Sequence, residues 1–197
     1  NVNVYQEYHR IEDAPADNTV LRWSNIEGNT FPVLNYYPFD EKIEAIIPQP
    51  AYLPMQYINT IIVFTRNSIN RIVLSNELNQ MAEMPANVIK EYSNLGLYAP
   101  NSLVETPQGL IWLSEGGVML WNRDGISNIS KNKINFNIYD KDAIIACYYP
   151  LLNQYILFVG ARERIAYVYH LGYDCWTRFI NFESKCTANL NYGTEDI

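Results

Sequence analysis

Short apolar runs separated by polar and glycine-containing clusters recur along this chain. Each run is rich in β-branched or aromatic residues and ends at turn-forming residues, which is the pattern of a β-strand. The predicted strands cover residues 19–23, 42–47, 60–65, 70–74, 109–114, 117–121, 143–149, 154–159, 165–170 and 176–179.

The connections between these runs are short. Turn-forming clusters lie at residues 66–68, 115–117, 122–125, 150–153 and 171–174. A parallel sheet would need a helix of ten or more residues between strands, for which the chain has no room. Helical periodicity is scarce, and its best window, Leu78 to Tyr92, is interrupted by Pro85. We therefore predict an all-β, antiparallel, short-stranded fold with little helix.

An internal repeat appears when the predicted hairpins are laid over one another. Phe64 aligns with Leu113 at an offset of 113 − 64 = 49, and Trp112 with Phe158 at an offset of 158 − 112 = 46. A period of roughly 40 to 50 residues with about four strands per unit is typical of β-propeller blades. We predict a β-propeller-like domain of about four to five blades, or a partial ring; a β-sandwich or irregular barrel stays open as the alternative.

The domain boundaries follow from where the strand pattern starts and stops. We predict an N-terminal arm over residues 1–18, the propeller-like domain over 19–190 and a C-terminal tail over 191–197. The chain does not begin with Met, so we expect a trimmed or partial chain. No run of 18 apolar residues and no signal-peptide pattern occurs, so no membrane segment is predicted.

The charge pattern argues against a nucleic-acid-gripping protein. The net charge is -7, and the 14 Lys and Arg residues are scattered, whereas binding by phosphate neutralisation needs them clustered. Cys147, Cys175 and Cys186 are an odd number without CxxC spacing. They indicate neither a disulfide framework nor a zinc site.

Residues that could carry chemistry are few. His9 and His170 have no Cys or carboxylate at metal-ligand spacing, which favours surface or structural histidines. No GxSxG occurs, and serines such as Ser68, Ser127 and Ser130 fall in turns. Gly116-Gly117 lacks the Walker spacing and a following helix, so it is predicted as a hairpin turn.

Neighbouring carboxylates are the other candidates for acid/base or cation chemistry. Asp140 and Asp142 flank Lys141, and Glu12 precedes Asp13, but exposed charge in turns explains both groups and no calcium-loop pattern is present. We therefore predict no catalytic, cofactor-binding or metal-binding residues, no cofactor, and a protein that is not an enzyme.

Aromatic residues are the remaining signal, with 16 tyrosines in 197 residues. They could line a carbohydrate or protein surface. Alternation between sheet packing and solvent is the interpretation that the pattern favours. The sequence does not separate a binding patch from a subunit interface. The residues concerned are Tyr36, Tyr37, Tyr148, Tyr149, Tyr155, Tyr167, Tyr169, Tyr173 and Trp176.

The order of these features resembles the β-propeller domains of short-tailed phage nozzle, packaged-DNA stabilisation and tail tubular proteins. The matching segments are 21–25 with Phe31-Pro32, 62–72, 95–104, 109–118 with Trp121, Asp124-Gly125 and Ile129-Ser130, and 148–176 with Gly172 and Trp176. The likeness covers residues 19 to 179 and lies in pattern and order. Such proteins usually have a longer chain.

This resemblance implies a structural virion protein of a bacteriophage tail, assembled in the host cytoplasm. Copies would form a homo-oligomeric ring that contacts portal, adaptor or other tail proteins, with DNA passing through its channel at ejection without specific binding. An acidic wall suits that role because it repels phosphates.

Two other classes stay open. A receptor- or glycan-binding propeller would place Tyr and Trp on one rim. A propeller-type glycoside hydrolase would need two facing carboxylates, a role that replacing Glu44, Asp124 or Asp142 would test.

Overall fold

The structure is a computed structural model that describes residues 18–22, 36–50, 60–74, 86–136, 140–159, 164–182 and 184. The sequence-based predictions for His9, for Glu12 and Asp13, for Cys186, for the segment from Trp23 to Pro32 and for the tail over 191–197 lie outside these residues.

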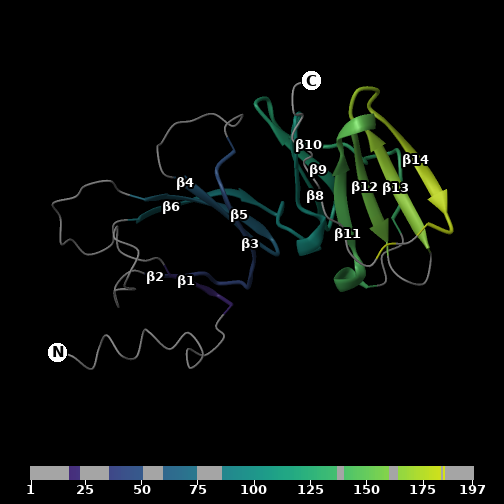
Figure 1. Cartoon of the computed structure of the whole chain (residues 1–197). Coiled ribbons are helices and arrows are strands. Elements are labelled where there is room, and N and C mark those ends of the chain that lie inside the picture. The colour runs from purple at the N-terminus through teal and green to yellow at the C-terminus, as the bar shows by residue number, and fades with distance from the viewer. Residues whose placement is uncertain are drawn as a thin grey trace, which may run out of the picture. The chain divides into compact units, whose positions relative to one another are not determined.

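The described chain forms strands and three short 3-10 helices, and it contains no α-helix (Figure 1). No helix in these residues is long and apolar enough to span a membrane. The elements are β1 (Val20–Arg22), β2 (Tyr36–Pro38), β3 (Ile43–Pro48), β4 (Thr60–Thr65), β5 (Ser68–Leu74), β6 (Ala86–Ser93), η1 (Pro100–Ser102), β7 (Val104–Thr106), β8 (Gly109–Ser114), β9 (Gly117–Asn122), β10 (Gly125–Asn128), η2 (Lys141–Ala143), β11 (Ile145–Tyr149), η3 (Pro150–Leu152), β12 (Gln154–Val159), β13 (Ile165–His170) and β14 (Cys175–Ile180).

The strands pair with their sequence neighbours. Three four-stranded sheets follow the chain as β3-β4-β5-β6, β7-β8-β9-β10 and β11-β12-β13-β14, and β1 pairs with β2 in a separate hairpin. Every pairing in the described residues is antiparallel. The predicted all-β, antiparallel fold class is therefore confirmed.

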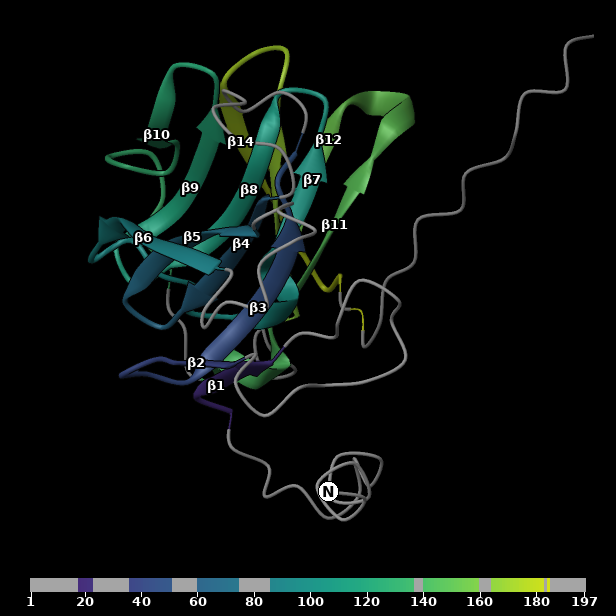
Figure 2. The ribbon, with the colours of Figure 1, turned by 90° about the vertical axis from the view of Figure 1, so that its left-hand side faces the viewer.

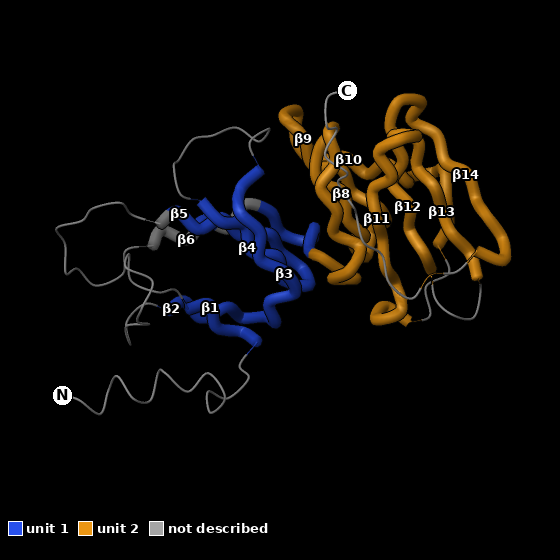
Figure 3. The backbone as a smooth tube through the Cα atoms, in the orientation of Figure 1, with its two compact units in different colours: residues 1–51, 55–96 blue, residues 52–54, 97–197 orange. Residues whose placement is uncertain are grey.

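The chain divides into two compact units, coloured separately in Figure 3. Residues 1–51 and 55–96 make up the first unit, and residues 52–54 and 97–197 make up the second. The extent of the predicted 19–190 domain stays a prediction.

In the first unit, the β1–β2 hairpin packs on one face of the β3–β6 sheet. Leu21 forms a small core with Val63 of β4 and Ile72 of β5, and Phe39 packs against it. Leu21 is opposite Tyr37 in the hairpin, so these two side chains share the inward face. The burial of Leu21 between exposed or half-buried neighbours gives this short hairpin its orientation.

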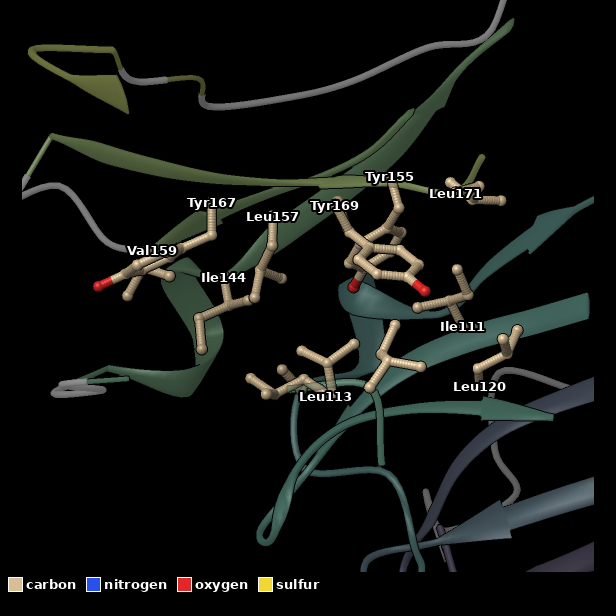
Figure 4. Packing of buried hydrophobic residues seen from close by; sticks show 14 residues of the cluster. Ile111, Leu113, Leu120, Ile144, Tyr155, Leu157, Val159, Tyr167, Tyr169 and Leu171 are labelled. Atoms are coloured by element: carbon tan, nitrogen blue, oxygen red, sulfur yellow. The ribbon is translucent and has the colours of Figure 1, made fainter. Parts of the chain in front are cut away.

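The second unit holds two four-stranded meanders that pack face to face. Figure 2 shows β7, β8, β9 and β10 side by side in chain order. Between the two sheets lies the largest described core, in which Tyr155, Leu157 and Val159 of β12 point toward Ile111 and Leu113 of β8 (Figure 4). At roughly 2 kcal/mol for each buried aliphatic side chain, this layer is a main source of stability for the unit.

Strand β8 is buried on both of its faces. Ile111 and Leu113 enter the core just described, while Leu110 and Trp112, on the opposite face, are equally buried. A strand that is apolar and buried at every position is typical of a sheet covered on both sides. This explains why the run 109–114 is continuously apolar where a half-exposed strand would alternate.

The repeat follows the strand bounds. The second strand of each sheet begins at Thr60, Gly109 or Gln154, which gives offsets of 109 − 60 = 49 and 154 − 109 = 45. The first offset equals the prediction, but the second aligns Leu113, and not Trp112, with Phe158. This one-residue correction matters because it moves each aligned side chain to the other face of its strand.

Equivalent positions of the two sheets in the second unit therefore point in the same direction along the stack, so only one of each pair lies in the core between the sheets. Ile111 of β8 points toward the β11–β14 sheet, whereas its equivalent Ile156 lies outside the shared core. Leu157, the equivalent of Trp112, points back toward β8. The face of the β7–β10 sheet that points toward the later part of the chain thus packs against the face of the β11–β14 sheet that points toward the earlier part. We call this arrangement head-to-tail stacking.

Several strand bounds differ from the prediction. The end of the weak helical window is strand β6, and Ala143, predicted to begin a strand, belongs to η2. The strands β2, β6, β7 and β10 were not predicted.

Candidate functional site

His170 ends β13 and is held by neutral partners. Its Nδ1 lies 3.1 Å from Nε2 of Gln154, and its Nε2 lies 3.0 Å from Oγ1 of Thr177. Both ring nitrogens therefore have hydrogen-bond partners on the neighbouring strands. No group of three His, Cys, Asp or Glu side chains in the described residues could hold a metal ion.

Asp140 and Asp142 lie at the start of η2. The Asp140 carboxylate accepts a hydrogen bond from the backbone amide of Asp142 at 3.0 Å, which caps this 3-10 helix. Asp124 lies exposed in the β9–β10 turn, and Glu44 on β3 pairs with Lys42 at 3.2 Å. Asp140 and Asp142 thus belong to one element, and Asp124 and Glu44 each belong to another. The described side-chain contacts of Asp140 and Glu44 are with residues two positions away in the sequence.

The predicted hairpin turn at Gly116-Gly117 is confirmed, since it joins β8 to β9. Gly117 has a φ of 123°, and a Cβ there would collide with Oγ of Ser130. That hydroxyl accepts a hydrogen bond from the Val118 amide at 2.9 Å and donates one to Oδ1 of Asn128 at 2.9 Å. Ser130 is thus a structural residue that fixes the turn.

Ser68 has a similar role in the β4–β5 turn. Its hydroxyl lies 2.8 Å from Oγ1 of Thr65, which also donates to the Glu41 carboxylate at 2.8 Å. The same carboxylate accepts hydrogen bonds from the backbone and side-chain amides of Asn67, at 3.0 and 2.9 Å. Glu41 therefore organises this turn.

Most of the highlighted tyrosines are packing residues. Tyr155, Tyr167 and Tyr169 are buried in the inter-sheet core, and Tyr148 and Trp176 pack at its margin. Burial raises the pKa of the Tyr155 phenol, which donates a hydrogen bond to the backbone carbonyl of Ser102 at 2.9 Å. The predicted alternation between packing and solvent describes this set, because Tyr149 and Tyr173 are exposed.

A polar cluster ties the β13–β14 turn to the segment after β10. Lys133 donates to the Asp174 carboxylate at 2.6 Å, and the Tyr169 phenol donates to the same oxygen at 2.9 Å. These two hydrogen bonds lower the pKa of Asp174, with that of Lys133 the stronger cause. The Trp176 indole donates to the Ile129 carbonyl at 3.0 Å. These contacts link the β7–β10 sheet to the β11–β14 sheet of the second unit.

The most exposed apolar side chains lie in two turns at one end of the β11–β14 sheet. Leu151 is 82% exposed and Tyr173 is 84% exposed, and Tyr149 and Leu152 are also exposed. A hydrogen bond of 3.1 Å from the Leu171 amide to the Asn153 carbonyl links the two turns. We name these four residues, Tyr149, Leu151, Leu152 and Tyr173, the apolar turn patch.

The apolar turn patch has the character of a contact site. Exposed apolar groups gathered at one place mark interaction surfaces more often than single exposed residues do. The sequence analysis treated residues 150–153 only as a turn. Two consecutive leucines where turns usually carry polar residues were the signal that could have found the patch.

The candidate residues in the described part of the chain form structural hydrogen bonds and apolar surfaces. They do not gather into a cluster of reactive side chains. Comparison with protein-family models and with curated proteins finds no match to this chain.

Proposed function

We propose that this protein is a structural, non-catalytic component of a bacteriophage tail, in which copies form a ring around the DNA exit channel. Three consecutive four-stranded meanders, at offsets of 109 − 60 = 49 and 154 − 109 = 45, support a propeller-like arrangement. The motif order over residues 19 to 179 supports the link to nozzle and tail tubular proteins. This link is an analogy of pattern.

The head-to-tail stacking in the second unit carries the propeller-like part of the proposal. Successive propeller blades present equivalent positions in the same rotational sense, so the following face of one blade contacts the preceding face of the next. Two sheets related as in a simple sandwich would bring equivalent faces together. Ile111 lies in the core between the two sheets, whereas its equivalent Ile156 lies outside that core. This difference favours the propeller arrangement over the sandwich.

The charge balance supports a channel role in the virion. A net charge of -7 disfavours tight phosphate binding, so DNA would slide past. Portal, adaptor or other tail proteins would be the neighbours, and the apolar turn patch offers a surface for such a contact.

The non-catalytic part of the proposal is supported by how the polar candidates are used. His170 contacts Gln154 and Thr177, Asp140 caps η2, and Ser130 fixes a hairpin turn. Each has a structural partner that explains its position.

The mass and shape of the purified protein test this proposal. Light scattering and negative-stain imaging would be recorded for the protein alone and mixed with purified portal or adaptor rings. Rings of the protein, or addition to those rings, would support a tail component. A monomer that ignores portal and adaptor rings would contradict it.

A receptor- or glycan-binding module is the second candidate, favoured by one observation. Tyr173 and Tyr149 are exposed at the same end of one sheet, as aromatic rings that stack on sugars would be. Binding to a glycan array that is lost in Tyr173→Ala but kept in Tyr155→Phe would favour this candidate.

A further inference from the structure

The β9–β10 turn contains the single Asp-Gly sequence of the chain, Asp124-Gly125. In such a pair, the amide nitrogen of the glycine can attack the side-chain carboxyl group of the aspartate before it. The attack is easiest where that carboxyl group has no other partner and where the following residue has no side chain to crowd the nitrogen. Among the described aspartates, Asp124 alone meets both conditions.

The carboxyl group of Asp124 is exposed, and it makes no hydrogen bond or ion pair within the described residues. The backbone amide of Asp124 donates to Oδ1 of Asn122 at 2.9 Å, which holds the residue in the turn and leaves its carboxyl group free. In contrast, the Asp140 carboxyl group accepts a hydrogen bond of 3.0 Å, and that of Asp174 accepts two, of 2.6 and 2.9 Å.

The nitrogen of Gly125 is not crowded by other residues. Gly125 has a φ of 114°, which glycine adopts freely, and a Cβ at this position would meet no heavy atom within 4 Å apart from its chain neighbours. Asp40 and Asp142 are exposed as well, but the residues after them are Glu41 and Ala143. Each of these places a Cβ beside the nitrogen that would have to attack.

We propose that Asp124-Gly125 is a modification site, at which the folded protein spontaneously forms a cyclic imide and then isoaspartate. The Gly125 nitrogen bonds to Cγ of the protonated Asp124 carboxyl group, whose hydroxyl leaves with the amide proton as water. Water then opens the imide. Opening at Cγ restores aspartate, whereas opening at the backbone carbonyl carbon of Asp124 leaves the chain running through Cγ. No oxidant or cofactor is consumed, and this site does not depend on the proposed tail function.

Isoaspartate adds a carbon to the backbone of a turn that has no spare length. Asn122 pairs directly with Gly125, so only the two residues between them connect β9 to β10. Figure 2 shows β10 beside β9, and in the described sheet β10 is an edge strand. The chain that leaves β10 includes Ile129, whose carbonyl accepts the 3.0 Å hydrogen bond from Trp176. Isomerisation therefore loosens β10 and weakens this link to the β11–β14 sheet.

Labelling with heavy oxygen tests the site. The folded protein is incubated at pH 7 in water enriched in heavy oxygen, and peptide mass spectrometry measures the label at each aspartate. Each passage through the imide incorporates one oxygen atom from water. Label should enter Asp124 roughly 10-fold or more faster than Asp40, which corresponds to a barrier lower by about 1.4 kcal/mol. Equal labelling of the two residues overturns the proposal, and so does label that enters Asp124 only when urea unfolds the protein.

Two substitutions at the same position are the matched controls. Asp124→Glu keeps the charge but would have to close a larger ring, so it should abolish the labelling. Asp124→Asn supplies a neutral amide, which is attacked more readily than a carboxylate, so it should form the same imide faster and release ammonia. Labelling of this peptide that is unchanged in Asp124→Glu would refute the reaction.

The effect on the fold is measured on protein that has isomerised. Isoaspartate-containing protein is separated from fresh protein by ion-exchange chromatography, and both are melted by circular dichroism. The isomerised protein should melt roughly 2–4 °C lower, because the β9–β10 connection no longer fits its strands. Equal melting temperatures would overturn the proposed loosening of β10.

Discussion

The phenol of Tyr155 on β12 donates a hydrogen bond of 2.9 Å to the backbone carbonyl of Ser102, across the core of the second unit. Ser102 is fully buried, and its own hydroxyl donates to the Ala99 carbonyl at 2.6 Å and accepts from the Leu113 amide at 2.9 Å. One residue of η1 thus joins the edge of the β7–β10 sheet to a tyrosine of the β11–β14 sheet. This bond fixes how the two sheets meet.

Tyr155→Phe keeps the ring and removes this bond. We expect a loss of roughly 1–2 kcal/mol in the free energy of unfolding, because a buried carbonyl loses its phenol partner. Urea unfolding at pH 7 measures the change. Tyr173→Phe, in the exposed turn, is the control and should leave the urea midpoint unchanged. A Tyr155→Phe midpoint equal to that of the wild type would show that the bond contributes nothing.

The same tyrosine predicts an alkaline limit to stability. Burial raises the pKa of Tyr155 above that of an unfolded phenol, so the folded state favours the neutral form. Its contribution is fully present below the unfolded pKa of about 10 and is lost as the pH rises beyond it. Stability should therefore fall more steeply between pH 9 and 11 in wild type than in Tyr155→Phe, by urea unfolding. Parallel pH curves for the two proteins would contradict this.

The β8–β9 turn gives a test in which the control is the adjacent residue. Gly117 has a φ of 123° and no room for a Cβ beside Ser130, whereas a Cβ at Gly116 would make an ordinary contact with Met119. Gly117→Ala should cost about 1–3 kcal/mol through backbone strain and displacement of Ser130. Gly116→Ala should change the melting temperature little. Equal effects of the two substitutions would rule out this account of the turn.

The inter-sheet core can be tested with two leucines of opposite exposure. Leu157 is fully buried between the sheets, and Leu151 in the nearby turn is 82% exposed. Leu157→Ala should cost about 2–5 kcal/mol because it leaves a cavity, while Leu151→Ala should stay within roughly 0.5 kcal/mol of the wild type. Chemical unfolding measures both. A small effect at Leu157 would mean that the two sheets do not pack as described.

Hairpin strands were predictable because two signals agree in them. The runs at residues 60–65, 109–114, 154–159 and 165–170 are apolar, β-rich and bounded by turn residues, and their bounds in the structure equal the predicted ones. Four strands were missed. Strand β6 lies at the end of the window with weak helical periodicity, and β2, β7 and β10 are only three or four residues long, so the pairing of these three depends on the neighbouring strand more than on their own sequence.

The surfaces were harder to predict than the strands. A period-two pattern predicts which side chains share a face, but the face itself depends on register, and a one-residue error in aligning Trp112 with Phe158 reversed it. The apolar turn patch was missed because a turn cluster reveals little about exposure. Glu41 and Ser130 gained their roles from partners distant in sequence, at Thr65 and Val118.

The pair of Lys133 and Asp174 makes a final prediction, for acidic pH. The Lys133 ammonium and the Tyr169 phenol hold the pKa of Asp174 below its usual range. A lowered carboxyl pKa contributes stability that is present at neutral pH and is lost as the pH falls through the usual carboxyl range toward the folded-state value. Because Asp174 is exposed, the contribution is small, roughly 0.2–1 kcal/mol, and salt weakens it.

Asp174→Asn should therefore lower the urea midpoint slightly at pH 7, and this difference should shrink as the pH falls from 7 to 2. In 1 M salt the difference at pH 7 should shrink, because screening weakens the charge pair while the hydrogen bond from Tyr169 stays. A difference that persists unchanged at pH 2 would mean that Asp174 acts through packing of the β13–β14 turn and not through its charge.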